Sequence, residues 1–278
     1  NQQYLVPDGV TILEACRFAG VNIPSLCYLK DVSSNASCGV CVVEVKGAKS
    51  LLRSCITKVT DGMEITTNNQ RIMQSRKMNV ELLLANHPLD CQTCERNLHC
   101  ELQQICYDFG ITERRFPRTR KKPIPKDFSS LSLVRDPEKC ILCGRCVAAC
   151  SEIQTVKAID FAGRGQKTRI STFMDLGLGL VACTNCGQCA LVCPTGAITE
   201  KDAVNDVWKV IHDPKKVVLV QTAPAIRVGI GEAMGMPYGS LVTGKMVAGL
   251  RRLGFSKVFD TDFAADLTIM EEGNELIH

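Results

Sequence analysis

Two cysteine runs with the same internal spacing constrain this chain more than any other feature of its 278 residues. Each has the pattern C-x2-C-x2-C-x3-C, which holds a [4Fe–4S] cluster. Where two runs occur together, the last cysteine of each ligates the cluster of the other. A single run could be a zinc knuckle, but two identical runs favour clusters and electron transfer. The predicted crossed sets are Cys140, Cys143, Cys146 with Cys193, and Cys183, Cys186, Cys189 with Cys150.

A third group of cysteines lies in the N-terminal segment, residues 1–75, which we expect to be rich in β-structure. Its members follow the pattern C-x10-C-x2-C-x13-C: Cys27, Cys38, Cys41 and Cys55. Four thiolates on a loop and a hairpin suit a [2Fe–2S] cluster, although the spacing departs from the plant-type C-x4-C-x2-C. A zinc site is the alternative. Cys16 falls within an expected helix, where a cysteine is usually a small buried apolar side chain.

Local signals predict several elements in this segment. Tyr4–Val6 is a candidate strand. Thr11 and Glu14 fit a capping box at the start of a helix that Gly20 would end. Residues 41–45 and 63–65 are further candidate strands.

Residues 76–115 begin with a helical run at 78–84 and continue with the pattern H-x3-C-x2-C-x5-C. The pattern consists of His87, Cys91, Cys94 and Cys100. A lone histidine is usually structural, but this one precedes three cysteines at ligand spacing. A neutral imidazole in place of an anionic thiolate changes the charge and the potential of a cluster. We therefore expect a third [4Fe–4S] cluster with His87 as its nitrogen ligand, and we treat His99 and Cys106 as non-ligands.

A basic, proline-containing connector extends from Arg114 to Lys126, with the linker itself expected at 116–126. Its simplest role is a solvated strap across the surface. A docking patch for an acidic redox partner is the alternative.

The last segment, residues 206–278, contains no cysteine. We expect a buried strand at 217–220, helices at 225–234 and 241–253, a strand at 257–260 and another helix from Ala264. This order predicts an α/β unit with parallel strand pairing.

Composition narrows the possible functions. Seventeen cysteines, many in Cys-x2-Cys repeats, indicate metal ligation rather than disulfides and a reducing, cytoplasmic setting. The net charge of +4 does not predict a nucleic-acid partner, and part of the excess Lys and Arg would balance negatively charged clusters. No apolar run reaches the ~18–20 residues that cross a bilayer. Gly239–Lys245 fits G-x4-G-K, but Met246 stands where a P-loop has a hydroxyl, so we expect no nucleotide site.

The order of these motifs resembles the N-terminal half of an [FeFe]-hydrogenase catalytic subunit, of the type found in multi-subunit NAD(P)- or ferredoxin-linked hydrogenases. The resemblance covers essentially the whole chain. The cluster order alone is shared with the large iron–sulfur subunit of NADH dehydrogenase and with NAD-linked formate dehydrogenases. The stretches Thr222–Glu232 and Asp262–Glu272 are similar to parts of the hydrogenase H-cluster domain, and they favour the hydrogenase.

The resemblance implies reversible interconversion of protons and H2 at an H-cluster. The four further cysteines that the family uses for this cluster are not among these residues, so we expect the chain to be part of a longer polypeptide. Glu272 and Glu275 match the spacing of two family glutamates that relay protons; two exposed carboxylates on adjacent helical turns are the alternative. The implied partners are ferredoxin, or flavin-NAD(P)-binding subunits with iron–sulfur clusters, in a hetero-oligomeric complex.

The expected fold is therefore α+β with several domains. The division is 1–75 for a β-grasp [2Fe–2S] ferredoxin domain, 76–115 for a small [4Fe–4S] domain with one histidine and three cysteine ligands, 116–126 for the linker, 127–205 for a bacterial-ferredoxin domain with two [4Fe–4S] clusters, and 206–278 for the start of an α/β H-cluster domain. The rival interpretations are an iron–sulfur subunit of an NADH or formate dehydrogenase, and a stand-alone polyferredoxin.

Overall fold

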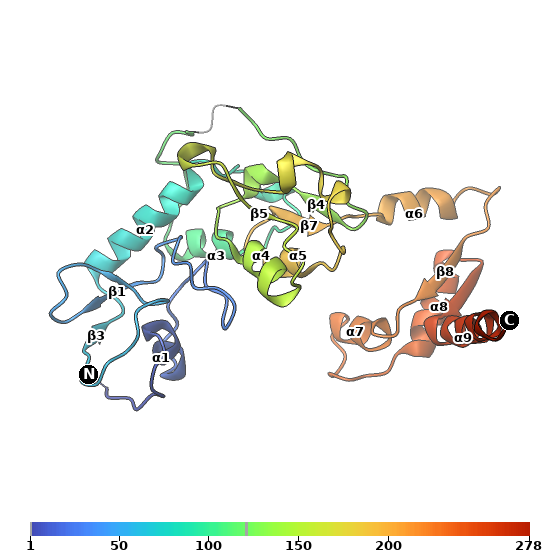
Figure 1. Cartoon of the computed structure of the whole chain (residues 1–278), viewed down its shortest axis with the longest axis horizontal. Coiled ribbons are helices and arrows are strands. Elements are labelled where there is room, and N and C mark those ends of the chain that lie inside the picture. The colour runs from blue at the N-terminus through green and yellow to red at the C-terminus, as the bar shows by residue number, and fades with distance from the viewer. Residues whose placement is uncertain (1, 120–121) are drawn as a thin grey trace. The chain divides into compact units, whose positions relative to one another are not determined.

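The computed structural model describes residues 2–119 and 122–278 (Figure 1). The chain divides into two compact units, one that ends at Lys201 and one from Asp202 to His278, and each is described by itself. In the described part of the chain, no helix combines the length and the apolar character that crossing a membrane requires.

The N-terminal part of the first unit is a small antiparallel sheet with one helix. Its elements are α1 (Ile12–Phe18), β1 (Val42–Val45), β2 (Leu52–Arg53) and β3 (Ile65–Thr66), in the strand order β2-β1-β3. Thr11 Oγ1 accepts a hydrogen bond from the Glu14 amide at 3.3 Å, which confirms the predicted helix start. The predicted strand Tyr4–Val6 is wrong: this stretch has no strand partner among the described residues, and Leu5 is 96% exposed.

Helix α2 (Gln70–Leu84) begins eight residues earlier than the predicted start at Met78. Asn69 caps it by accepting a hydrogen bond from the Ile72 amide at 2.9 Å. The first two turns are mostly polar, so apolar periodicity did not reveal them. The expected division at 75/76 therefore falls inside a continuous helix, which Arg76 ties to β1 by donating to the Val42 carbonyl at 2.8 Å.

After η1 (Cys91–Thr93) and α3 (Glu101–Asp108), the basic connector follows the surface of the first unit. Arg115 pairs with Glu81 at 3.1 Å, and Lys126 pairs with Asp136 at 3.3 Å. Arg118 also pairs with Glu138. These contacts are those of a strap held along the surface; residues 120 and 121 of the connector lie outside the described residues.

The rest of the first unit is a compact repeat of short elements. These are β4 (Leu133–Arg135), η2 (Pro137–Lys139), α4 (Arg145–Ala148), η3 (Ala149–Ile153), β5 (Asp160–Ala162), η4 (Gly165–Lys167), β6 (Arg169–Ser171), η5 (Phe173–Asp175), η6 (Leu178–Leu180), α5 (Gln188–Leu191) and β7 (Ile198–Glu200). Strand β4 pairs with β7 and β5 with β6, both antiparallel. Gly144 and Gly187 precede α4 and α5 at equivalent places, with φ of +78° and +77°. This left-handed conformation favours glycine at both positions.

The second unit has an α/β arrangement, as predicted. Its elements are α6 (Val204–Ile211), β8 (Leu219–Thr222), α7 (Ile226–Ala233), α8 (Thr243–Leu253), β9 (Lys257–Asp260) and α9 (Thr261–Ile277). Strands β8 and β9 pair in parallel, and Gly254 ends α8 with φ of +109°. Helix α6 was not predicted. The strand expected at 217–220 begins at Leu219 and is mostly exposed rather than buried, because this unit provides only one neighbouring strand among the described residues.

Candidate iron–sulfur sites

The four N-terminal cysteines, called here the Cys27 site, are brought together by the β1–β2 pair and the preceding loop. Cys41 directly precedes β1 and Cys55 follows β2, so the antiparallel register places them side by side. Cys27 and Cys38 come from the loop, with their sulfurs 3.4 Å apart. All four thiols are at most 6% exposed.

Ionisation of these four thiols is mutually dependent. A hydrogen bond from Cys38 lowers the pKa of Cys27 to about 2, and one from Cys55 lowers the pKa of Cys41 to about 6. Hydrogen bonds with Cys27 raise the pKa of both Cys38 and Cys55. The four thiols thus form one connected group, in which Cys27 contacts Cys38 and Cys55, and Cys55 also contacts Cys41. This arrangement fits a cluster with two irons held by four cysteines.

His87 lies just beyond the end of α2, with its amide donating to the Leu84 carbonyl at 3.2 Å. Arg114 Nη2 donates to the His87 carbonyl at 2.6 Å and holds this segment in place. The imidazole is 8% exposed, and burial lowers its pKa to about 4, so it is neutral at pH 7. The ring hydrogen-bonds the backbone of Lys139, whereas Nδ1 is buried without a hydrogen-bond partner among the described residues. A neutral ring held on one side, with the other nitrogen unpaired, fits a metal ligand.

The cysteines that accompany His87 lie on η1 and at the start of α3. Together with His87 we call them the His87 site: Cys91, Cys94 and Cys100. Lys139 Nζ donates to Cys94 Sγ at 3.3 Å, and Cys100 Sγ donates to the Pro194 carbonyl at 3.5 Å. Cys106 is half-buried further along α3, where burial raises its pKa to about 12. His99 is exposed.

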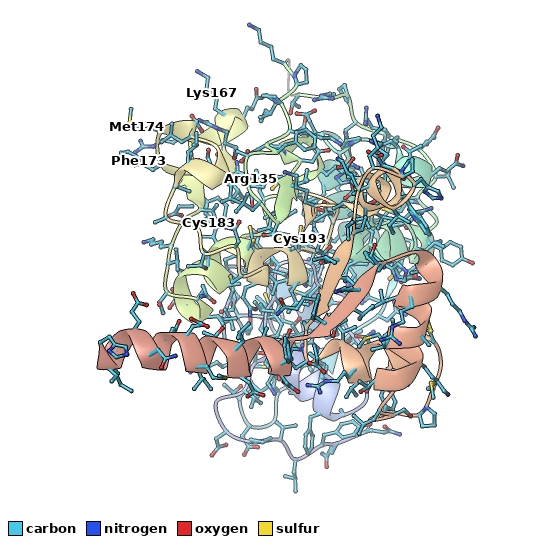
Figure 2. The ribbon with its side chains drawn as sticks, turned by 90° about the vertical axis from the view of Figure 1, so that its right-hand side faces the viewer. Arg135, Lys167, Phe173, Met174, Cys183 and Cys193 are labelled. Carbon is cyan, nitrogen blue, oxygen red and sulfur yellow. The ribbon has the colours of Figure 1, made fainter. Side chains whose placement is uncertain are left out.

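The first crossed set, the Cys140 site, surrounds a partly open cavity. Its lining includes the four sulfur residues Cys140, Cys143, Cys146 and Cys193, together with Arg135. Burial raises the pKa of Cys143 to about 12 and that of Cys146 as well. Figure 2 shows Arg135 and Cys193 in the same region of the unit, although they lie 58 positions apart in the sequence.

The second crossed set, the Cys183 site, surrounds a separate, partly open cavity. Its lining includes Cys150, Cys183, Cys186 and Cys189. The remaining lining residues are uncharged, among them Leu133, Ile159 and Leu178. Burial raises the pKa of Cys189 to about 11, whereas Cys186 is exposed. Each cavity is therefore lined by three cysteines of one run and the last cysteine of the other, a donor set that fits a cubane.

The four sites are linked by direct contacts within the first unit. Cys27 and Cys38 share one apolar core with Cys143, and Asn35 Nδ2 donates to the Cys143 carbonyl at 2.7 Å. The His87 site meets the Cys140 site where Cys100 contacts Pro194, the residue after Cys193. Cys146 and Cys193 of the Cys140 site share an apolar core with Cys150, Cys183 and Cys189 of the Cys183 site. The Cys140 site is thus the neighbour of all three others.

Sequence reasoning missed several residues that hold these sites together. Arg145, between two cysteines of the first run, is 7% exposed and forms a bidentate pair with Glu101 at 2.6 and 3.0 Å. Lys139, directly before Cys140, reaches Cys94. The sequence does show a charged residue next to a ligand cysteine in both cases. It does not show the partner of that charge, because each partner lies more than 40 positions away.

Within residues 2–119 and 122–278, no three His, Cys, Asp or Glu side chains form a site suited to a single metal ion.

Glu272 and Glu275, the predicted proton carriers, lie on α9 of the second unit. They are three positions apart, and both are exposed.

Four family models match successive parts of the chain. A model of the 2Fe-2S iron-sulfur cluster binding domain matches residues 1–70, and the NADH-ubiquinone oxidoreductase-G iron-sulfur binding region matches residues 76–115. A 4Fe-4S dicluster domain matches residues 139–197. The C-terminal domain of the iron only hydrogenase large subunit matches residues 216–278, within the second unit.

Similarity to individual proteins extends over almost the whole chain. The NADP-reducing hydrogenase subunit HndD of Solidesulfovibrio fructosivorans is 47% identical over 98% of this chain. Iron hydrogenase 1 of Clostridium pasteurianum is 36% identical over 99% of it. Over nearly its whole length, the chain is thus similar to part of each of these two hydrogenases. It spans 47% and 48% of the length of these two hydrogenases.

A solved structure of an NAD+-reducing [NiFe]-hydrogenase in the H2-reduced state contains a chain that is 32% identical to this one. The match has a TM-score of 0.66 and covers 72% of this chain and 84% of that one. The matched family models support iron–sulfur cofactors in this chain, and its described elements form a mixed α/β fold.

Proposed function

We propose that this chain is the electron-relay part of an [FeFe]-hydrogenase catalytic subunit, with one [2Fe–2S] and three [4Fe–4S] clusters. The observation that carries the proposal is the packing of the Cys140 site against each of the other three cysteine sites. Two-electron chemistry on H2 requires a path that carries electrons singly, and a bound iron–sulfur cluster accepts and releases one electron at a time.

The ligand sets are the ones predicted from spacing. The Cys27 site would hold the [2Fe–2S] cluster, and the His87, Cys140 and Cys183 sites one [4Fe–4S] cluster each. The three-stranded sheet around the Cys27 site supports a β-grasp ferredoxin domain, and the remaining divisions follow the predicted domains 76–115, 127–205 and 206–278.

The residues around the sites favour a branched path. Asn35 and the apolar core connect the Cys27 site to the Cys140 site, and the contact of Cys100 with Pro194 connects the His87 site to it. Two inputs would therefore converge on the Cys140 site. The Cys183 site, which shares an apolar core with the Cys140 site and has one exposed cysteine, would be the output towards an H-cluster held by further residues of the subunit.

The substrates of this path would be protons and H2. Glu272 and Glu275 on α9 are proposed proton carriers, because carboxylates three positions apart on a helix are within reach of one another. Ferredoxin, or a flavin-NAD(P) subunit with its own clusters, would exchange electrons with the two inputs in a cytoplasmic hetero-oligomeric complex. The relative HndD is named as a subunit of an NADP-reducing hydrogenase, and this supports such a complex.

A dehydrogenase subunit is the second candidate, supported by the NADH-ubiquinone oxidoreductase-G model at residues 76–115. The hydrogenase is favoured because the match at residues 216–278 is to a hydrogenase domain.

The test is anaerobic purification of the complete subunit, followed by iron and sulfide analysis, EPR and an H2-uptake assay. We expect about 14 iron atoms from this part of the subunit, two from one [2Fe–2S] and twelve from three [4Fe–4S] clusters. His87→Ala should alter one [4Fe–4S] signal, while His99→Ala, at an exposed neighbour, should alter none. Zinc in place of iron, or a fully clustered and matured subunit without H2 uptake, would contradict the proposal.

A further inference from the structure

Lys139 is a buried cation at the junction of two predicted cluster sites. It is 7% exposed, and its Nζ lies 3.3 Å from Cys94 Sγ. The nearest carboxylate, Asp90, is 3.8 Å away and half exposed. Burying an ammonium group costs several kcal/mol unless an anion compensates it. The thiolate of Cys94 is the closest group that can do so.

The backbone of Lys139 is held as firmly as its side chain. Its carbonyl accepts a hydrogen bond from Thr195 Oγ1 at 2.8 Å, and the imidazole of His87 hydrogen-bonds the same backbone. Its amide donates to the Asp136 carbonyl at 3.1 Å. One residue therefore supports two members of the His87 site, Cys94 through its side chain and His87 through its backbone.

Gly196 leaves the space in which this contact forms. A Cβ on Gly196 would lie 2.9 Å from Cys94 Sγ and 3.3 Å from Cδ of Lys139. The lysine stem and the cysteine sulfur thus approach the same glycine, in the segment that follows Cys193 of the Cys140 site. The charge of Lys139 is therefore placed between the His87 site and the Cys140 site.

We propose that Lys139 sets the reduction potential of the cluster in the His87 site by donating a charge-assisted hydrogen bond to Cys94. A cluster gains one negative charge on reduction, and a fixed positive charge at a ligand sulfur stabilises that reduced form, more strongly at a buried position than in water. Hydrogen bonds to the sulfurs are among the factors that set cluster potentials. The inference rests on the proposed function, because it requires that His87, Cys91, Cys94 and Cys100 hold a cluster.

The test is a redox titration of the complete subunit, followed by EPR, with attention to the [4Fe–4S] signal that His87→Ala alters. In Lys139→Met the midpoint potential of this signal should fall by at least about 59 mV. For one electron, this shift is a tenfold change in the ratio of reduced to oxidised cluster at a given potential. Lys139→Arg keeps the charge and should stay within threefold of the unmodified protein. The [2Fe–2S] signal of the Cys27 site should not move in either variant.

Lys46→Met is the matched control, because it removes the same charge at a position that is 73% exposed and paired with Glu64. An unchanged midpoint in Lys139→Met, or an equal shift in Lys46→Met, would overturn the inference. If Lys139→Met does not retain the signal, the comparison of Lys139→Gln with Lys139→Arg replaces it. A lower midpoint potential in the glutamine variant alone supports the role of the charge. Equal midpoint potentials in the two variants would overturn the inference. Absence of every [4Fe–4S] signal from the unmodified protein would instead contradict the proposed function.

Discussion

The Cys140 and Cys183 sites have the same cysteine spacing but different surroundings. The cavity of the Cys140 site is lined by Arg135, which is 9% exposed and whose Nη1 has no hydrogen-bond partner among the described residues. Two further buried cations, Lys139 and Arg145, directly precede Cys140 and Cys146 in the sequence. The cavity of the Cys183 site is lined by uncharged residues, and its Cys186 is exposed. Equal motifs therefore predict equal clusters, while the neighbouring charges differ.

This difference has an energetic meaning. A buried guanidinium N–H without a partner is costly, and an anionic cluster in the adjacent cavity would supply the partner. The cluster of the Cys140 site should then be the easier of the two to reduce. Solvent near the exposed Cys186 also makes the cluster of the Cys183 site easier to reduce, although it adds no fixed charge. It therefore makes the difference between the reduction potentials of the two clusters smaller.

The largest effect is expected from breaking the crossed ligand sets. Cys193→Ala should remove the same [4Fe–4S] signal as Cys143→Ala, because both residues line one cavity. Cys150→Ala should match Cys186→Ala in the same way. Each variant should lose about four iron atoms per chain. EPR and iron analysis of the four variants check this, and a match between Cys193→Ala and Cys186→Ala would show uncrossed sets.

A smaller effect is expected from removing the charge that distinguishes the two sites. Arg135→Met should lower the midpoint potential of the Cys140-site signal, because the reduced cluster loses a buried positive neighbour. The expected shift is about 59 mV, which is a tenfold change in the ratio of reduced to oxidised cluster. The signal of the Cys183 site should move less. EPR-monitored titration measures both. Arg164→Met, at an exposed position, is the control, and equal shifts in the two variants would show that Arg135 has no special role.

The smallest effect concerns the equivalent glycines before α4 and α5. Both have a left-handed backbone, so alanine should cost about 1–2 kcal/mol at either position. At Gly144 the new Cβ would also lie 2.5 Å from Asn35 Nδ2 and disturb its hydrogen bond to Cys143, adding about 1 kcal/mol. At Gly187 no heavy atom of the described part lies within 4 Å. Denaturant unfolding should rank Gly144→Ala as the less stable variant, and equal stability would contradict the contact.

Elements with a strong local signal could be predicted from the sequence. The capped start of α1, the strand at 257–260 and the glycine end of α8 follow from short patterns, and the structure confirms them. The start of α2 could not be predicted, because its first turns are polar and are held by Arg76 and by the Asn69 cap. Tyr4–Val6 failed as a strand for the opposite reason: its local pattern is suitable, but no neighbouring strand in the described part of the chain pairs with it.

The candidate ligands were determined by the sequence alone, because the spacing of neighbouring cysteines limits which sulfurs can reach one cluster. Tertiary structure alone decided what surrounds them. Asn35 meets Cys143 across 108 positions and Lys139 meets Cys94 across 45. Contacts of this range depend on how separate segments pack, which no local pattern encodes. The residues expected to tune each cluster are therefore visible only in the folded chain.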